Sequence, residues 1–290
     1  SKTASQQSFT NGQTEVPGNP KYYLRHVVSS VVGAGNYCLT QQKIEGVSTL
    51  AGKTATLSFW AKADSNKNIA TEFSQNFATG GSPSSTVNGI GVTTHSLTTS
   101  WQKFTTTVSI PSISGKTLGT NGNDYLHLLI WFDSGSTYNS RNNSLGQQSG
   151  TFDIAQVQIE EGSSATPFEH RPAGVELSLC QRYYEVIKQF YPLGMYTSGS
   201  GERFYLTSKI KYATEKRAQP SITITADSSY WTVPGVVAVS GSTTHVFTAH
   251  GAYSNGHSAY SNRHSGNNTP SSSSVYLYEA SITHKILAEL

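Results

Sequence analysis

Large aromatic side chains on the polar faces of predicted strands are the first candidates for binding chemistry in this sequence. In residues 54–62, Leu57 and Phe59 alternate with a polar face that also carries Trp60. In residues 125–132, Trp131 shares a face with His127, opposite a wholly apolar face. Sugar rings stack their C–H faces on aromatic rings, while their hydroxyls seek amides and carboxylates. These residues therefore predict a saccharide platform.

Carboxylate and amide side chains on neighbouring strands complete this candidate site. Residues 68–77 place Ile69 and Phe73 on one face, and Glu72 and Asn76 on the other. Gln42, in the predicted strand 36–43, joins them if the strands pair suitably. The predicted glycan-binding residues are Trp60, Trp131, His127, Glu72, Asn76 and Gln42. The alternative for each tryptophan is packing under a loop, against a second domain or in a subunit interface.

Catalytic chemistry has little support in the sequence. Glycoside hydrolysis uses two carboxylates at a set separation. No motif pairs two of the 17 acidic residues, and the adjacent Glu160 and Glu161 point to opposite faces of a strand. The nucleophile motif G-x-S-x-G is also absent. We therefore expect a binding protein with no catalytic residues.

Metal ligands are equally sparse. His250, His257 and His264 recur every seven residues, which brings no set of ligands together along the chain. A zinc site needs converging ligands, and no cysteine supports one here. We expect these histidines to be exposed hydrogen-bonding residues, and we predict no metal site and no cofactor.

Composition narrows the class of partner. Charged residues make up only 13% of the chain, so Ser, Thr, Asn, Gln and Gly must supply the polar surface. The net charge of +3 and the lack of a basic run argue against nucleic acid. No apolar run is long enough to cross a membrane, and we expect no membrane insertion. Cys38 and Cys180 lie beside apolar residues and are predicted to be buried free thiols, which fits folding in a reducing cytoplasm.

Short strands separated by turn residues account for the first part of the chain. The predicted strands are 22–29, 36–43, 54–62, 68–77, 102–110, 125–132 and 151–160. Residues 1–20 indicate an extended arm or a first edge strand. Two long loops, 78–89 and 133–150, are expected to be functional or ordered by a partner. Because long helical periodicity is missing, the pattern predicts an all-β sandwich.

A change of pattern near residue 163 predicts a domain boundary. Residues 162–174 contain two prolines and indicate the exit from the first domain, so we predict domains at 1–170 and 171–290. Residues 175–187 predict a short helix followed by a strand. Further predicted strands are 203–212, 220–225, 235–239, 244–248 and 275–284. Together they indicate a second, smaller β domain.

Several segments resemble bacteriophage tail-fibre and tail-tip proteins. They include QSFTNGQTEVPGNP, LAGKTATLSFWAKAD, LGQQSGTFDIAQVQIEEGSSATPFEHRP and ELSLCQRYYE, and the resemblance spans roughly residues 7–186. LSFWAKAD and FDIAQVQIEEG are also similar to jelly-roll carbohydrate-binding modules. The resemblance implies a jelly-roll domain in a virion tail protein that assembles in the bacterial cytoplasm. It also implies attachment to host-surface polysaccharide, a homotrimer and contacts with other tail proteins.

The same resemblance leaves three questions open. Jelly-roll sugar-binding modules can hold a structural calcium ion, whereas residues 121–124 could equally be a simple turn. The candidate calcium ligands are Asn123, Asp124, Asp153 and Glu160. The alternative to receptor binding is a structural fibre or adaptor segment that binds neighbouring virion chains. A polysaccharide depolymerase is a third, more distant reading.

A tandem repeat marks a second candidate contact surface. AYSNGHS (252–258) is followed at once by AYSNRHS (259–265), with six of seven positions matching. Tyrosine amid Ser, Gly and Asn is the mixture that antibody paratopes use. We predict that residues 249–274 contact the receptor as a structured loop or hairpin, and the alternative is a flexible loop without a partner. The predicted contact residues are Tyr253, Asn255, His257, Tyr260, Asn262, Arg263 and His264.

Overall fold

The computed structural model describes residues 1–187, 194–197, 204–217, 221–226, 247–253, 256–261 and 282–287. The chain divides into two compact units, Ser1–His170 and Arg171–Glu289. Within the described residues, no helix has the length and apolar character needed to span a membrane.

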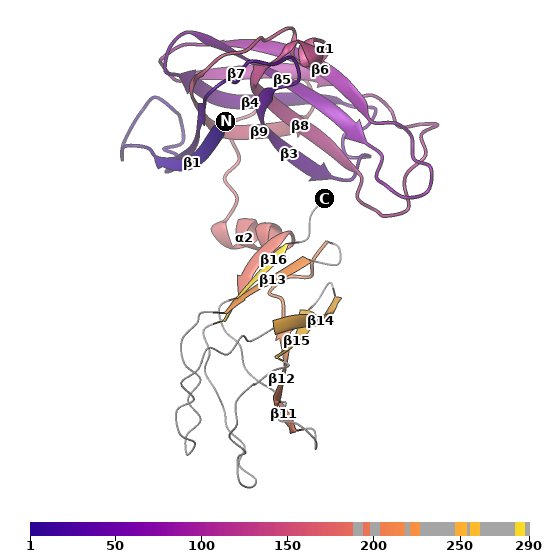
Figure 1. Ribbon diagram of the computed structural model, residues 1–290. Helices are drawn as coiled ribbons and strands as arrows, with labels where there is room; N and C mark the ends of the chain where they lie inside the picture. Colours follow the sequence, from indigo (N-terminus) through magenta and orange to yellow (C-terminus); the bar gives the residue numbers. More distant parts are fainter. Residues whose placement is uncertain are drawn as a thin grey trace. The chain divides into compact units, whose positions relative to one another are not determined.

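The first unit consists of two antiparallel sheets, which Figure 1 shows as two layers. Sheet A has the order β1 (Lys2–Ser8), β2 (Tyr22–Val28), β9 (Gly150–Glu161), β4 (Thr54–Ala63) and β7 (Gln102–Ser109). Sheet B has the order β3 (Tyr37–Glu45), β8 (Tyr125–Ser134), β5 (Lys67–Asn76) and β6 (Val87–Leu97). From β2 to β9 the chain alternates between the sheets, except at the β5–β6 hairpin. This is a jelly-roll arrangement, so the predicted all-β fold is confirmed.

The core lies between the two sheets and is filled by alternate residues of the central strands. In β4, Leu57 and Phe59 are fully buried, and in β8, Leu128 and Phe132 belong to the same apolar cluster. Each such side chain contributes about 1.5–3 kcal/mol by leaving water. Because the side-chain period of a strand is two, the intervening residues project from the outer face of each sheet. The outer faces therefore carry the side chains that the core does not use.

Strand β6 was not predicted, and its first residues fall in the predicted loop 78–89. The sequence VNGIGVTTHSL contains glycines that weaken a strand pattern. Gly91 has a positive φ of 61°, and a Cβ there would lie 2.3 Å from a methyl group of Val108. The pairing of β5 with β6 also shifts register twice. The backbone of β6 comes close to Val108 at Gly91, and its pairing with β5 is irregular. These two features explain why apolar and polar residues do not alternate regularly along β6.

The other predicted long loop, 133–150, is largely ordered structure. Strand β8 continues to Ser134, and the chain then forms a 3-10 helix, η1 (Ser136–Tyr138), and a short helix, α1 (Asn139–Asn142). Strand β9 begins at Gly150.

At the start of the chain, β1 pairs with β2 at the edge of sheet A. Of the two alternatives predicted for residues 1–20, an extended arm or a first edge strand, the structure therefore has the edge strand.

The second unit begins with the predicted helix and strand, α2 (Ala173–Gln181) and β10 (Tyr184–Ile187). One sheet has the order β10, β16 (Ile282–Leu287) and β13 (Ser221–Ala226). The other has the order β11 (Gly194–Thr197), β12 (Phe204–Lys211), β15 (Gly256–Ser261) and β14 (Phe247–Tyr253). The predicted strand 235–239 lies outside the described residues.

Helix α2 has no buried residue. Its exposed side chains include Val175, Leu177 and Leu179. Cys180 is exposed as well, whereas Cys38 is buried, so the prediction of two buried thiols is wrong for Cys180. The reason is that apolar sequence neighbours indicate burial only when the whole helix packs against a core.

Candidate binding cleft

A cleft of about 850 Å³ lies over sheet B and the free edge of β3. Its floor comes from residues that alternate away from the core, such as Leu129 and Trp131 of β8 and Ser74 of β5. Tyr138 and Arg141, from η1 and α1, form one wall. The jelly-roll topology thus places the segment after β8 directly over the strands that it follows.

A fully buried carboxylate lies beneath this cleft. Glu72 is 0% exposed and accepts hydrogen bonds from Arg141 Nε at 2.8 Å and Arg141 Nη2 at 2.6 Å. Trp131 Nε1 donates to it at 3.2 Å, and the backbone N–H of Gly89 at 3.3 Å. A buried carboxylate needs such partners to offset its lost hydration. Glu72, a predicted glycan ligand, therefore holds α1 against the floor of the cleft.

Trp131 lies in the cleft floor and is 1% exposed. The Arg141 guanidinium lies 5.3 Å from the centroid of its indole ring, and Tyr138 packs against the ring at 5.3 Å. Packing under a loop, the alternative raised from the sequence, is therefore the arrangement observed. The exposed aromatic ring of the cleft is Tyr37, which is 52% exposed and contacts Tyr138 edge-on at 4.9 Å.

Tyr37, Tyr138 and Arg141 are residues of the cleft that the sequence analysis did not select. Tyr37 is the first residue of β3, where alternation gives little guidance. Tyr138 and Arg141 lie within the segment 133–150, whose length predicts a loop that is functional or ordered by a partner. Loop length was thus the one signal that pointed towards Tyr138 and Arg141.

His127 occupies the floor of the cleft beside Ser74 and Tyr125. It is 9% exposed, its Nδ1 lies 3.4 Å from Ser74 Oγ, and its Nε2 is buried without a hydrogen-bond partner. Desolvation, followed by the charges of Lys43 and Arg141, lowers the pKa of His127 to about 4. The imidazole is therefore neutral at pH 7 and offers one donor and one acceptor.

Gln42 and Asn76 are placed differently from the prediction. Gln42 pairs in register with Leu128, whose side chain is in the core, so Gln42 belongs to the inward face and Gln41 lines the cleft instead. Asn76 accepts a hydrogen bond from Ala78 N at 3.1 Å and donates to Thr86 Oγ1 at 3.1 Å. Its amide therefore closes the turn after β5.

Trp60 lies on a different sheet from the cleft. It projects from the outer face of sheet A and packs with Phe9, Tyr23 and Trp101 around the buried Val16. Since β4 and β8 belong to different sheets, their outer faces point away from each other. Trp60 and Trp131 therefore cannot form one platform, which corrects the single site predicted from the sequence.

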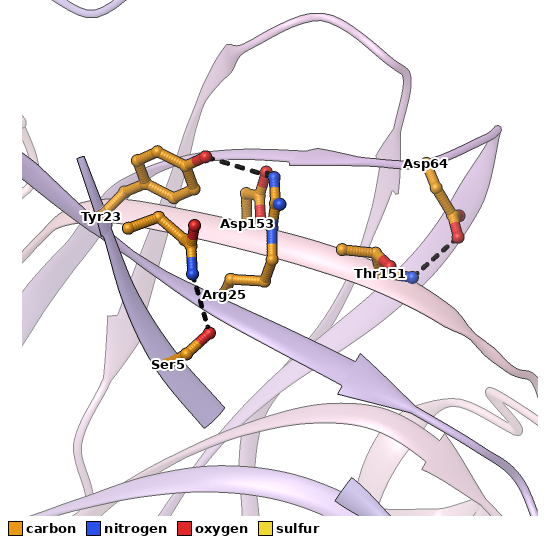
Figure 2. A network of polar contacts seen from close by, with 7 residues as sticks. Ser5, Tyr23, Arg25, Asp64, Thr151 and Asp153 are labelled. Carbon is orange, nitrogen blue, oxygen red and sulfur yellow. Dashed lines mark hydrogen bonds and ion pairs between the residues drawn. The ribbon is translucent and has the colours of Figure 1, made fainter. Parts of the chain in front are cut away.

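Figure 2 shows a polar network on sheet A that involves one of the predicted calcium ligands. Arg25 donates to both carboxylate oxygens of Asp153, at 2.7 and 2.8 Å, and to the Tyr23 hydroxyl at 3.2 Å. The hydrogen bond to Asp153 raises the pKa of Arg25. Nearby, Thr151 N donates to Asp64 at 2.8 Å. Asp153 thus serves as the partner of a guanidinium.

The other predicted calcium ligands also bind protein groups, at separate points. Asp124 accepts from Val47 N at 2.7 Å, and Asn123 accepts from Thr79 N at 2.8 Å. Glu160 accepts hydrogen bonds from Thr166, which lower the pKa of its carboxyl. Within the part of the chain that the structure describes, no three His, Cys, Asp or Glu side chains converge as metal ligands do. Calcium binding stays a prediction.

The tandem repeat lies partly in a β-hairpin. Tyr253 ends β14 and pairs with Gly256, while His257 and Tyr260 lie in β15. Residues 247–253 and 256–261 therefore form a β-hairpin. Asn255, Asn262, Arg263 and His264 lie outside the described residues, and a receptor contact by this repeat stays a prediction.

No family model matches this chain, and no curated protein matches it. Two solved structures that resemble it are carbohydrate-binding modules. One is a CBM4 protein, with a TM-score of 0.32 and 21% identity over 51% of this chain and 74% of that chain. The other is a family 30 carbohydrate binding module, with a TM-score of 0.31 and 15% identity over 55% of this chain and 91% of that chain. Similarities of this size support no argument about function, which must come from the cleft.

Proposed function

We propose that this chain binds a saccharide chain in the sheet B cleft. The observation that carries the proposal is the half-exposed ring of Tyr37 in an open cleft of about 850 Å³ that Gln41 and Asn88 also line. An aromatic ring beside amides is the combination that a sugar requires, because the ring takes its C–H face and the amides take its hydroxyls.

We propose further that binding occurs without cleavage. The acidic side chains at the cleft are Glu72, beneath the floor, and Asp133, in the lining. Glu72 is held by Arg141 and Trp131, and Asp133 accepts from Ser30 Oγ at 2.8 Å and Gln148 N at 2.7 Å. A general acid or base must reach the proton that it transfers. Both carboxylates are buried and already hydrogen-bonded, which supports a binding role.

Replacing Tyr37 by alanine tests the cleft. We expect polysaccharide affinity to fall about tenfold, which corresponds to ~1.4 kcal/mol, because the stacking surface is removed. The melting temperature should change little, because half of this side chain is already in water. A bacterial polysaccharide array would identify ligands, and calorimetry would measure affinity. Tyr22→Ala, a 43% exposed tyrosine on sheet A, is the matched control. Unchanged affinity in Tyr37→Ala would place the binding site elsewhere.

The resemblance to tail-fibre proteins supports a more specific role. We propose that the protein is part of a phage tail, assembles in the bacterial cytoplasm and attaches the virion to host-surface polysaccharide. Residues of the tandem repeat would add a second contact with the receptor.

A structural adaptor is the second candidate function, and helix α2 favours it. Val175, Leu177 and Leu179 are exposed on a nine-residue helix with no buried residue. Exposed apolar side chains that gather on one element mark contacts with other chains. Such contacts would join this protein to neighbouring tail proteins or to further copies of itself.

A homotrimer is the oligomeric state that we expect. Light scattering at micromolar concentration should return three times the chain mass of 31.2 kDa. Leu177→Lys should lower this mass if α2 contributes to the interface, because burying an unpaired ammonium group is unfavourable. Lys103→Gln, an exposed position on β7, should leave it unchanged. A monomer for the unmodified protein would contradict the trimer.

A further inference from the structure

The Arg141 guanidinium is fixed on one edge and open on the other. Its Nε and Nη2 donate to Glu72, and its plane lies over the indole of Trp131. Its Nη1 donates to no protein group in the part of the chain that the structure describes. The side chain is 26% exposed and lines the cleft. A guanidinium held in this way binds a carboxylate with little further loss of conformational entropy.

Two further cations lie near the cleft. Lys2 lines it at the free edge of β3, where its ammonium group donates to the carbonyl oxygen of Leu39. Lys43 lies with its Nζ 4.8 Å from the ring centroid of Tyr125, which lines the other end of the cleft. Leu39 and Lys43 are about 13 Å apart along β3, at 3.3 Å per residue. The positive charges are therefore spread along the length of the floor.

The acidic groups near the cleft are less available to a ligand. Glu72 and Asp133 are buried and accept hydrogen bonds from protein donors. Glu45, at the end of β3, is not among the residues that line the cleft. Desolvation is the main cause that lowers the pKa of His127 in the floor, and the charges of Lys43 and Arg141 lower it further. Among the side chains that line the cleft, Lys2 and Arg141 are positive, and the negative Asp133 is buried. The charge accessible within the cleft is therefore mainly positive, although the chain as a whole is nearly neutral.

We propose that the sheet B cleft selects saccharide chains that carry carboxylates, with the open edge of the Arg141 guanidinium as the carboxylate-binding group and Lys2 and Lys43 as flanking cations. This inference rests on the proposed saccharide binding and specifies its ligand. Repeated carboxylates along an acidic polysaccharide match cations spread along β3, whereas a neutral polysaccharide gains nothing from them.

The test compares polysaccharides that differ only in charge. Polygalacturonate, alginate and hyaluronate would each be measured by calorimetry against its carboxyl-reduced counterpart, at low and at high salt. We expect carboxyl reduction to weaken binding about tenfold or more, as the loss of a charge-assisted hydrogen bond does. Salt should weaken binding of the acidic polymers only, because screening acts on charge pairs.

Variants assign the effect to the three cations. Arg141→Lys keeps a charge beside Glu72 but removes the planar fork, and we expect about tenfold weaker binding of acidic polymers. Because this change touches a buried pair, Lys2→Gln and Lys43→Gln provide a second test that leaves Glu72 untouched. We expect them to weaken binding severalfold together and to reduce its salt dependence. Lys103→Gln, on β7 of sheet A, is the control for net charge.

The outcomes separate this inference from the function on which it rests. Equal binding of acidic and carboxyl-reduced polymers would overturn the selection for carboxylates and leave saccharide binding intact. Unchanged affinity of the acidic polymers for all three cation variants, compared with the parent protein, would also overturn it. The carboxylates would then be recognised elsewhere. Failure to bind any polysaccharide, charged or neutral, would contradict the proposed function itself.

Discussion

Acidification from pH 7 towards pH 4 is expected to lower the free energy of unfolding steeply, because three buried histidines resist protonation in the folded state. Desolvation is the first cause in each case, and it lowers the pKa values of His26, His95 and His127 to about 4. In the unfolded chain a histidine titrates near pH 6.5. Between these values the unfolded state binds more protons than the folded state does.

The sign of the effect follows from this difference. The stability contributed by each neutral histidine is fully present above about pH 6.5 and is lost as the pH falls towards 4. Each histidine adds a slope of up to about 1.4 kcal/mol per pH unit in that window. His26 has no hydrogen-bond partner on either ring nitrogen, and His95 is held by Thr71 Oγ1 at 2.9 Å. The Asp153 carboxylate favours the imidazolium of His26, but desolvation outweighs it. The contributions of the three histidines therefore act in the same direction.

Urea unfolding at pH 7, 6 and 5 would measure this loss. His26→Phe is the informative variant, because His26 already packs on Phe132 with ring centroids 4.6 Å apart and makes no hydrogen bond. A phenyl ring keeps the packing and removes the titration, so the pH slope should fall by up to about 1.4 kcal/mol per pH unit. The same slope in the variant and the parent would show that His26 is protonated alike in both states.

Replacing Trp131 by alanine is expected to cost about 3–5 kcal/mol of folding free energy. The indole is almost completely buried, packs with Ala70 and Leu129 and donates a hydrogen bond to Glu72. Truncation leaves a cavity under Arg141 and removes one donor from a buried carboxylate. Denaturant titration with fluorescence or circular dichroism would measure the change.

Trp60→Ala is the comparison that makes this result specific. Trp60 is only partly buried in the satellite cluster on sheet A, so its loss should cost less than that of Trp131. Neither tryptophan presents a free stacking face in the sheet B cleft. Trp131→Ala with nearly unchanged stability and weakened saccharide binding would show that the indole does reach a ligand, against the burial observed here.

Residue alternation within single strands could be predicted from the sequence, because it depends on local geometry alone. The pattern in β8 placed Leu128 in the core and His127 on the opposite face, and the structure agrees. In β5 it likewise separated Phe73 from Glu72. The two-residue period of an extended chain fixes these faces whatever the partner strand is. Short strands separated by turn residues, without long helical periodicity, indicated the all-β class for the same local reasons.

Pairing and register were decided by the tertiary structure. Trp60 and Trp131 have similar local patterns, yet β4 and β8 belong to different sheets, and only the order of strands in space separates them. Gln42 was misplaced because its register with Leu128 depends on the neighbouring strand. Strand β6 stayed hidden because the close approach of Gly91 to Val108 involves residues far apart in sequence.

The sequence by itself therefore determined the fold class, the faces of the strands and the types of residue available for binding. The tertiary structure decided which of them share a cleft. It joined Tyr37 to Tyr138 and Arg141, covered Trp131 and paired Glu72 with a guanidinium 69 positions away in the chain. The physical reason is that side-chain direction follows from local backbone geometry, whereas the convergence of side chains depends on long-range strand pairing.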